Sequence, residues 1–238
     1  MTGTVVGPAR LRRPADRSLP PAPLWLPVAI AAAGWLTWSS IMLAGRPAKP
    51  ADPLGHLLGS SSMTLAMMGP LAIPLAATVR RSALWTAAGG AVASALGTYL
   101  GLWLAAGSAL HLLADGLVAV TGTTPLAAVL ALVCAADAAS RGRYRRVDGC
   151  RLSRPLLPSA PRLDAARLGA DAFRPCLTTC WAPMALSVVV PATAVPLSVL
   201  LIVERALLPR PRRLLVAAHL LLAGAVVLVP ITREWASA

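Results

Sequence analysis

Long apolar runs, separated by short basic or proline-rich stretches, dominate this chain. An α-helix needs about 20 apolar residues to cross a bilayer, and most of these runs approach or exceed that length. We therefore expect an all-α fold, a polytopic transmembrane helical bundle of about seven spans. The runs place the spans near residues 24–44, 57–79, 83–113, 117–139, 175–190, 192–208 and 214–231.

Prolines and glycines refine this pattern. Pro70 and Pro74 lie inside the second span and predict a kink after Gly69. In the third span, Gly90, Gly97, Gly101 and Ser94 are expected to let a neighbouring backbone approach closely.

The apolar stretch 176–203 is too long for one straight span. As a single helix it would measure about 42 Å, against a hydrocarbon core of about 30 Å. Pro191 and Pro196 offer a turn inside it. If the chain turns there, nearly all the basic clusters fall on one side of the membrane, as the positive-inside rule requires. We therefore predict a short helical hairpin at 175–208; a re-entrant hairpin fits the charges equally well.

The same charge pattern sets the domain organisation. Residues 1–23 are basic and proline-rich, and we expect a disordered cytoplasmic tail. Residues 24–235 form a single transmembrane domain, with the first span retained rather than cleaved as a leader. A basic cytoplasmic loop is expected at 140–174. The predicted location is the inner membrane of a bacterium, with the N-terminus in the cytoplasm.

Composition agrees with a membrane protein. Hydrophobic residues make up 57% of the 238 residues and charged residues 13%, about half the usual share in soluble domains. The net charge of +13 sits in clusters between apolar runs, which favours anionic lipid headgroups over nucleic acid as the partner of the basic loops. No catalytic triad, phosphate loop or pair of intramembrane carboxylates is visible, so we expect no enzyme.

One sulfur-rich stripe carries candidate chemistry. Cys176, Cys180 and Met184 follow each other at four-residue spacing and share one helix face. Thiolate and thioether sulfurs are soft ligands that suit Cu(I), and thiolates also bind Zn(II). Met67 or Met63 of the second span could complete such a metal site. The alternative is that these side chains only pack, because Cys and Met behave as hydrophobes inside helices.

A second polar pair lies near the outer end of the third span. His111 and Asp115 are four residues apart on the same helix. They predict either a proton-carrying or metal-binding pair, or a solvated pair at the membrane interface.

Three blocks resemble a known family. They are MTLAMMGPLAIPL at 63–75, CLTTCWAPM at 176–184, and Glu204-Arg205 followed by Pro209; Tyr99-Leu100 with Trp103 adds to them. The chain resembles, over about residues 30–225, the bacterial family of "predicted metal-binding integral membrane proteins". The resemblance implies a membrane topology and a metal site that includes the cysteines. Where that family has adjacent cysteines before the tryptophan, this chain has Thr179-Cys180, and of its loop cysteines it retains Cys150.

These observations favour an integral inner-membrane protein that binds or handles a soft metal such as copper. Two alternatives remain open. The first is a metal-free membrane scaffold or assembly protein. The second is a small-solute permease gated at the break between Pro191 and Pro196. The sequence also leaves open a membrane-protein partner or a homo-oligomer.

Overall fold

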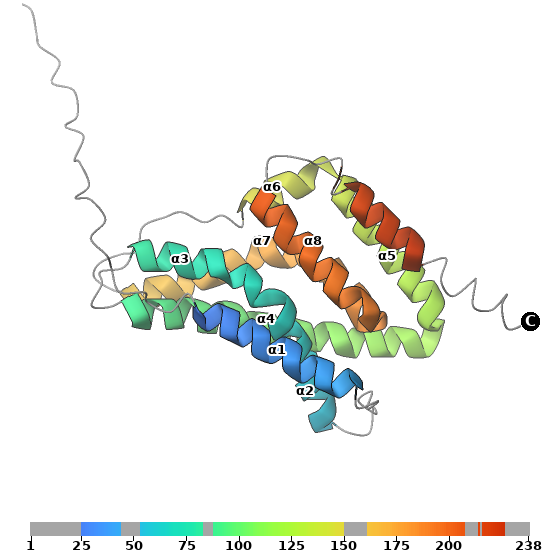
Figure 1. Ribbon diagram of the computed structural model, residues 1–238, viewed down its shortest axis with the longest axis horizontal. Coiled ribbons are helices and arrows are strands. Elements are labelled where there is room, and N and C mark those ends of the chain that lie inside the picture. Colours follow the sequence, from blue (N-terminus) through green and yellow to red (C-terminus); the bar gives the residue numbers. More distant parts are fainter. Residues whose placement is uncertain are drawn as a thin grey trace, which may run out of the picture.

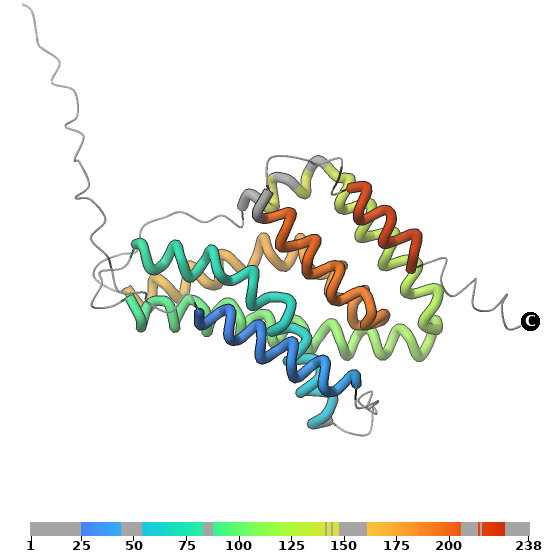
Figure 2. Tube along the Cα trace, in the orientation of Figure 1, coloured from blue at the N-terminus to red at the C-terminus, as the bar shows by residue number. Residues whose placement is uncertain are grey.

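The computed structural model describes residues 25–43, 53–82, 88–149, 161–207, 214 and 216–226 of the chain, and within these ranges every regular element is helical (Figure 1). The predicted all-α class is therefore confirmed. The α-helices are α1 Trp25–Leu43, α2 Pro53–Met68, α3 Ile73–Ser82, α4 Ala88–Thr121, α5 Thr123–Ala139, α6 Arg141–Gly149, α7 Pro161–Val189 and α8 Ala194–Leu207. Two short 3₁₀ turns, η1 Pro70–Ala72 and η2 Pro191–Thr193, interrupt the path, and a last apolar helix covers Val216–Val226 (Figure 2).

Few of these helices have the length and composition of a complete membrane span. In the described part of the chain, α1 and α4 do, and the bent pair Leu54–Met68 and Pro70–Ser82 adds a third if it counts as one span. Helix α5 and the helix Val216–Val226 are apolar but shorter. The structure thus supports two or three spans, and the count of seven remains a prediction. The tail predicted at 1–23, as well as Cys150 and Pro209, lies outside the described residues.

The predicted kink in the second span is present. Helix α2 ends at Met68, η1 begins at Pro70, and the axes on the two sides of this break differ by 43°. Proline has no N–H to donate and its ring collides with the preceding turn, so the helix cannot continue straight through Pro70. The helical hydrogen bonding continues as far as Gly69, whose N–H donates to the Leu65 carbonyl at 2.9 Å.

The segment expected to be a basic loop, 140–174, differs from that expectation. Its described parts form α6 and the first half of α7, and α7 then continues through Pro175 and Pro183 to Val189. The first half of α7 is amphipathic: Ala165, Leu168 and Ala172 are buried while its arginines at 162, 167 and 174 point outward. The arginines on its outer face give this segment the composition of a basic loop, which is why the sequence analysis did not predict a helix here.

The break after α7 comes at Pro191 alone. Val190 leaves the helical conformation, η2 makes the turn, and α8 begins at Ala194. Pro196 lies in the first turn of α8, where a missing N–H costs nothing because that donor has no partner in the helix. Helix α8 then runs back along α7, so that Arg205 reaches Cys176.

Helices α4 and α7 form the largest helix–helix contact and pack in parallel (Figure 1). Gly169 of α7 lies against the backbone of Ala95, so closely that a Cβ on Gly169 would be 2.4 Å from the Ala95 carbonyl oxygen. Contrary to expectation, Gly97 and Gly101 do not serve this purpose, since a Cβ on either would meet nothing within 4 Å. A Cβ on Gly90 would meet the Arg162 side chain of α7, 2.7 Å from its Nε, rather than a backbone. The close approach of the two helices therefore depends on Gly169 of α7 rather than on the glycines of α4. It also fixes how far α7 is shifted along α4, and so which residues of α4 face the cysteines.

We predict opposite outcomes for the same substitution at these glycines. Gly169→Ala pushes α7 off α4 and should lower the free energy of unfolding by about 1–3 kcal/mol. Gly97→Ala only gains helix propensity and should leave stability unchanged or raise it slightly. Thermal unfolding of the purified variants in detergent measures both, and an unaltered midpoint for Gly169→Ala would contradict the packing described above.

Candidate metal-binding site

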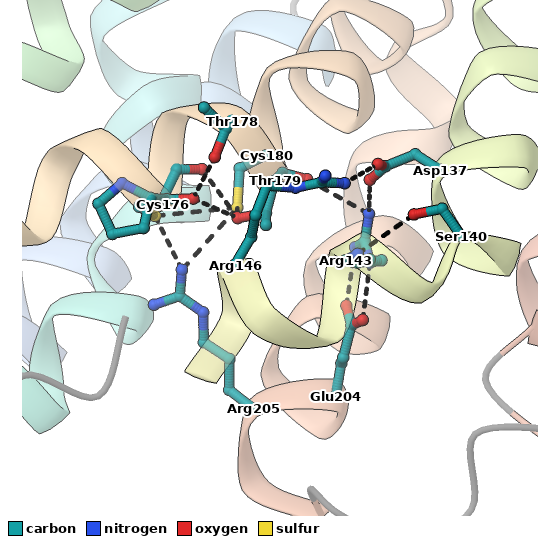
Figure 3. A network of polar contacts seen from close by, with 11 residues as sticks. Asp137, Ser140, Arg143, Arg146, Cys176, Thr178, Thr179, Cys180, Glu204 and Arg205 are labelled. Atoms are coloured by element: carbon teal, nitrogen blue, oxygen red, sulfur yellow. Dashed lines mark hydrogen bonds and ion pairs between the residues drawn. The ribbon is translucent and has the colours of Figure 1, made fainter. Parts of the chain in front are cut away.

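The two cysteines of the sulfur stripe face each other on successive turns of α7. Their Sγ atoms are 3.8 Å apart, and both side chains are fully buried (Figure 3). Met184 lies one further turn along the same helix and is also fully buried. The stripe predicted from the four-residue spacing therefore points into the core.

Met63 and Met67 come from a different helix. Both are buried in α2 and belong to the same hydrophobic core as the cysteines. Helix α2 packs mainly against α1 and α4, while the cysteines lie on α7. The structure thus gathers all five predicted sulfur side chains in one core but pairs only Cys176 with Cys180.

Three helices supply polar partners to this pair. The Tyr99 hydroxyl of α4 is 3.0 Å from the Cys176 Sγ. From α8, the Arg205 guanidinium donates from Nη2 to the Cys176 Sγ at 2.8 Å, and the same nitrogen is 4.0 Å from the Cys180 Sγ (Figure 3). The Thr179 hydroxyl lies 3.6 Å from the Cys180 Sγ. The contact between the two sulfurs and their burial both favour the protonated thiols, and the charge of Arg205 opposes these two effects. A metal ion that displaces the thiol protons therefore finds a positive charge beside the thiolates, which are the form that binds metals.

Local hydrogen bonds shape α7 around the pair. Pro175 precedes Cys176 and cannot donate to the helix. The Thr178 hydroxyl donates to the Pro175 carbonyl at 2.9 Å, and the Thr179 hydroxyl is within 3.0 Å of the carbonyls of both Pro175 and Cys176. These back-bonds orient the threonine hydroxyls along the turn that carries the cysteines.

A buried ion network adjoins the sulfur pair. Arg143 of α6 donates from Nε and Nη2 to the two carboxylate oxygens of Glu204, at 2.7 Å each. Its Nη1 contacts the carboxylate of Asp137 and lies 3.4 Å from the Thr179 carbonyl, while Arg146 contacts the other oxygen of Asp137 (Figure 3). The network therefore ties α5, α6 and α8 to the turn of α7 that carries the cysteines.

Arg143 keeps its charge in this buried position. Burial alone would lower its pKa, but the hydrogen bonds and charge of Glu204, together with the charge of Asp137, raise the pKa above its ordinary value. The carboxylates of Glu204 and Asp137 therefore compensate the cost of burying the Arg143 charge. Removing one partner would leave the others buried and uncompensated.

The sequence analysis missed Arg143 and Asp137 as site residues, and it noted Tyr99 and Arg205 only in the family resemblance. A signal for some of them was present. Asp137 and Arg205 each lie near the end of an apolar run, where an ionisable side chain suggests a function. Arg143 could not be singled out, because it is one of many arginines in the basic segment.

The spacing of the two sulfurs suits a shared metal ion. Two thiolates about 2.3 Å from one tetrahedral ion lie about 3.8 Å apart, which is the separation that Cys176 and Cys180 show. Among the described residues, however, no three His, Cys, Asp or Glu side chains are already arranged to hold a metal. The arrangement is thus a two-thiol site, which fits a soft ion with few ligands better than a closed structural zinc site.

The ion network yields a test of its structural role. Arg143→Gln leaves Glu204 buried without its cation and should cost about 3–5 kcal/mol of stability. The matched control is Arg145→Gln on the same helix, because Arg145 is exposed and its loss should change stability little. Thermal unfolding of both variants distinguishes the two, and equal midpoints would show that the network does not hold α6 and α8 to α7.

Comparison with known proteins gives a match to a protein family. A family model for PpoB2, described as a copper chaperone, matches residues 61–229, which include both cysteines, Tyr99, Arg143 and Arg205. No curated protein and no solved structure matches the chain. Copper is one of the two soft metals expected from the sulfur stripe, while the named resemblance to predicted metal-binding integral membrane proteins remains a prediction. The match covers well over half of the chain, and the chain therefore belongs to the PpoB2 family of copper chaperones.

Proposed function

We propose that this protein binds Cu(I) through Cys176 and Cys180 and passes the ion on, a role of binding and transfer rather than catalysis. One observation carries the proposal: a buried pair of thiols at the spacing of two metal ligands, with a guanidinium against it. The family match supports copper as the cargo. Met184, Met67 and Met63 are proposed as auxiliary thioether ligands, since they are buried in the same core.

The charge of Arg205 favours Cu(I) over Zn(II). A copper(I) ion held by two thiolates carries a single negative charge, which the adjacent guanidinium neutralises. With Zn(II) the same groups would leave a net positive charge in the core, and uncompensated buried charge is costly. Binding releases the thiol protons, and Arg205 then serves as the counter-ion of the copper–dithiolate unit. A site with few ligands also leaves room for an incoming thiol or thioether to take the ion away.

The direct test measures Cu(I) affinity. The purified protein should hold about one Cu(I) per chain against a colorimetric Cu(I) chelator, because thiolates select this ion. Cys176→Ser/Cys180→Ser should lose it. The matched control is Cys134→Ser, a buried free cysteine on α5, which should bind as the parent does. Equal, near-zero copper in the parent and the double variant would favour the metal-free scaffold instead.

The role of Arg205 is tested in the same titration. Arg205→Gln leaves both thiols in place but removes the counter-charge, so Cu(I) affinity should fall by at least about tenfold. Arg205→Lys retains the charge and should recover part of that loss. Arg167→Gln is the control, because Arg167 is exposed on the outer face of α7. Unchanged affinity in Arg205→Gln would refute the charge argument while leaving the thiol site intact.

We also propose that the protein is a multi-pass protein of the bacterial inner membrane with its N-terminus in the cytoplasm. Support comes from α1 and α4, which are long and apolar enough to span, and from large apolar side chains exposed along α4 from Leu102 onward. Water would disfavour such a surface and lipid would not. In this orientation the exposed arginines of α6 and α7 would meet anionic headgroups on the cytoplasmic side, which is the side that the positive-inside rule favours for basic residues.

Two exposed positions, one before and one after helix α5 in the chain, test this orientation. In a Cys150→Ser background, Val120→Cys at the end of α4 should react with a membrane-impermeant thiol reagent in intact cells. Arg145→Cys on α6 should react only after the membrane is opened. The reverse pattern would overturn the orientation. Both side chains are exposed, so neither substitution should disturb the core.

A further inference from the structure

The two cysteines of the sulfur pair differ in the polar groups that surround them. The Cys176 Sγ lies 3.0 Å from the Tyr99 hydroxyl and 2.8 Å from the Arg205 Nη2. The same Arg205 nitrogen is 4.0 Å from the Cys180 Sγ. Although the two thiols lie one helical turn apart, the stronger donors therefore converge on Cys176.

The Thr179 hydroxyl does not make up this difference at Cys180. Its oxygen lies 3.6 Å from the Cys180 Sγ but within 3.0 Å of the carbonyls of Pro175 and Cys176. A hydroxyl has a single proton to donate, and here a carbonyl receives it. The hydroxyl thus turns lone pairs toward Cys180, whose own thiol proton can point to the Cys176 sulfur 3.8 Å away.

The Tyr99 hydroxyl favours a negative charge on Cys176. Tyr99 is buried on α4, so its phenolic O–H gains most when a strong acceptor faces it. A neutral thiol is only a weak acceptor, whereas hydrogen bonds to an ionised group are roughly twice as strong as neutral ones. Tyr99 and Arg205 can both donate to a Cys176 thiolate, and both contacts strengthen when that thiol ionises.

The buried ion network of Arg143 does not reverse this preference. Arg143 reaches the Thr179 carbonyl at 3.4 Å and so comes close to the turn that carries Cys180. The two arginines of the network are paired with two carboxylates, so that their charges cancel. Arg205 lies nearer to Cys176, and its charge therefore favours the ionisation of that sulfur.

We infer that Cys176 is the first of the two thiols to ionise and the ligand that keeps Cu(I), that Tyr99 is its positioning residue, and that Cys180 is the ligand exchanged during transfer. This inference rests on the proposed function. The Cys176 thiolate takes the ion first, and the Cys180 thiol then bonds to copper and gives its proton to the medium.

Transfer reverses the second of these steps. The thiol of an acceptor forms a bond to copper while the bond between copper and Cys180 breaks, and the proton of the acceptor thiol passes to Cys180. Copper remains Cu(I), and the unit of copper and two thiolates keeps its single negative charge. The acceptor implied by this order is one that offers a thiol.

The first test measures ionisation without copper. The protein carries Cys134→Ser and Cys150→Ser, and nuclear magnetic resonance of Cβ-labelled cysteine follows each thiol as the pH rises. Cys176, observed in Cys180→Ser, should ionise at a lower pH than Cys180 observed in Cys176→Ser. Tyr99→Phe should raise the midpoint of Cys176 by at least about one pH unit, because it removes a hydrogen bond to a charged group.

The same Tyr99→Phe substitution in the Cys176→Ser protein is the matched control, and it should leave the midpoint of Cys180 unchanged. A purely structural role of Tyr99 would move both midpoints or neither. The inference is overturned if Cys180 ionises at or below the pH of Cys176, or if Tyr99→Phe leaves the midpoint of Cys176 where it was. Failure of Cys176 to ionise while the protein stays folded also overturns it.

The second test compares Cu(I) affinity in competition with a chelator. Cys180→Ser should retain at least about tenfold more affinity than Cys176→Ser, because it keeps the thiolate with two donors. Equal affinities, or the reverse order, would overturn the inference while leaving Cu(I) binding by the parent intact. A parent protein that binds no Cu(I) would overturn the proposed function and the ligand order with it, even where Cys176 ionises first.

Discussion

The contact between the partly buried Arg205 guanidinium and the buried Cys176 sulfur, 2.8 Å apart, is the interaction on which the proposed chemistry depends. A cation withdrawn from water gains from a nearby anion, and a buried thiol pair becomes a metal ligand only as thiolate. Here the thiolates would supply the anion that Arg205 needs, and Arg205 would supply the positive charge that stabilises the thiolates. The turn at Pro191 is what makes the contact available, because it sends α8 back along α7 until Arg205 reaches the cysteines.

The surrounding structure holds this contact in register. Gly169 lets α7 approach the backbone of α4, which sets the height at which Tyr99 meets Cys176. On the other side, Arg143 binds Glu204, the neighbour of Arg205, and reaches the Thr179 carbonyl between the two cysteines. The sulfur pair is thus fixed by a packing contact on one side and by an ion network on the other.

Local pattern predicted the helical class, the kink at Pro70 and the pairing of Cys176 with Cys180, because each depends on residues a few positions apart. Contacts between distant segments were out of reach. Nothing in the sequence ties Arg143 to Glu204, since such a pair is brought together only by packing. The amphipathic first half of α7 was missed for a different reason: its outward arginines gave the segment the composition of a loop.

The central claim is that copper sits between two thiolates beside Arg205. It is tested most directly by X-ray absorption at the copper edge, on the Cu(I)-loaded protein. The claim predicts an edge typical of Cu(I) and a ligand shell dominated by sulfur, which Cys176→Ser/Cys180→Ser abolishes. A shell of nitrogen and oxygen alone, or an unchanged spectrum without the two cysteines, would contradict it.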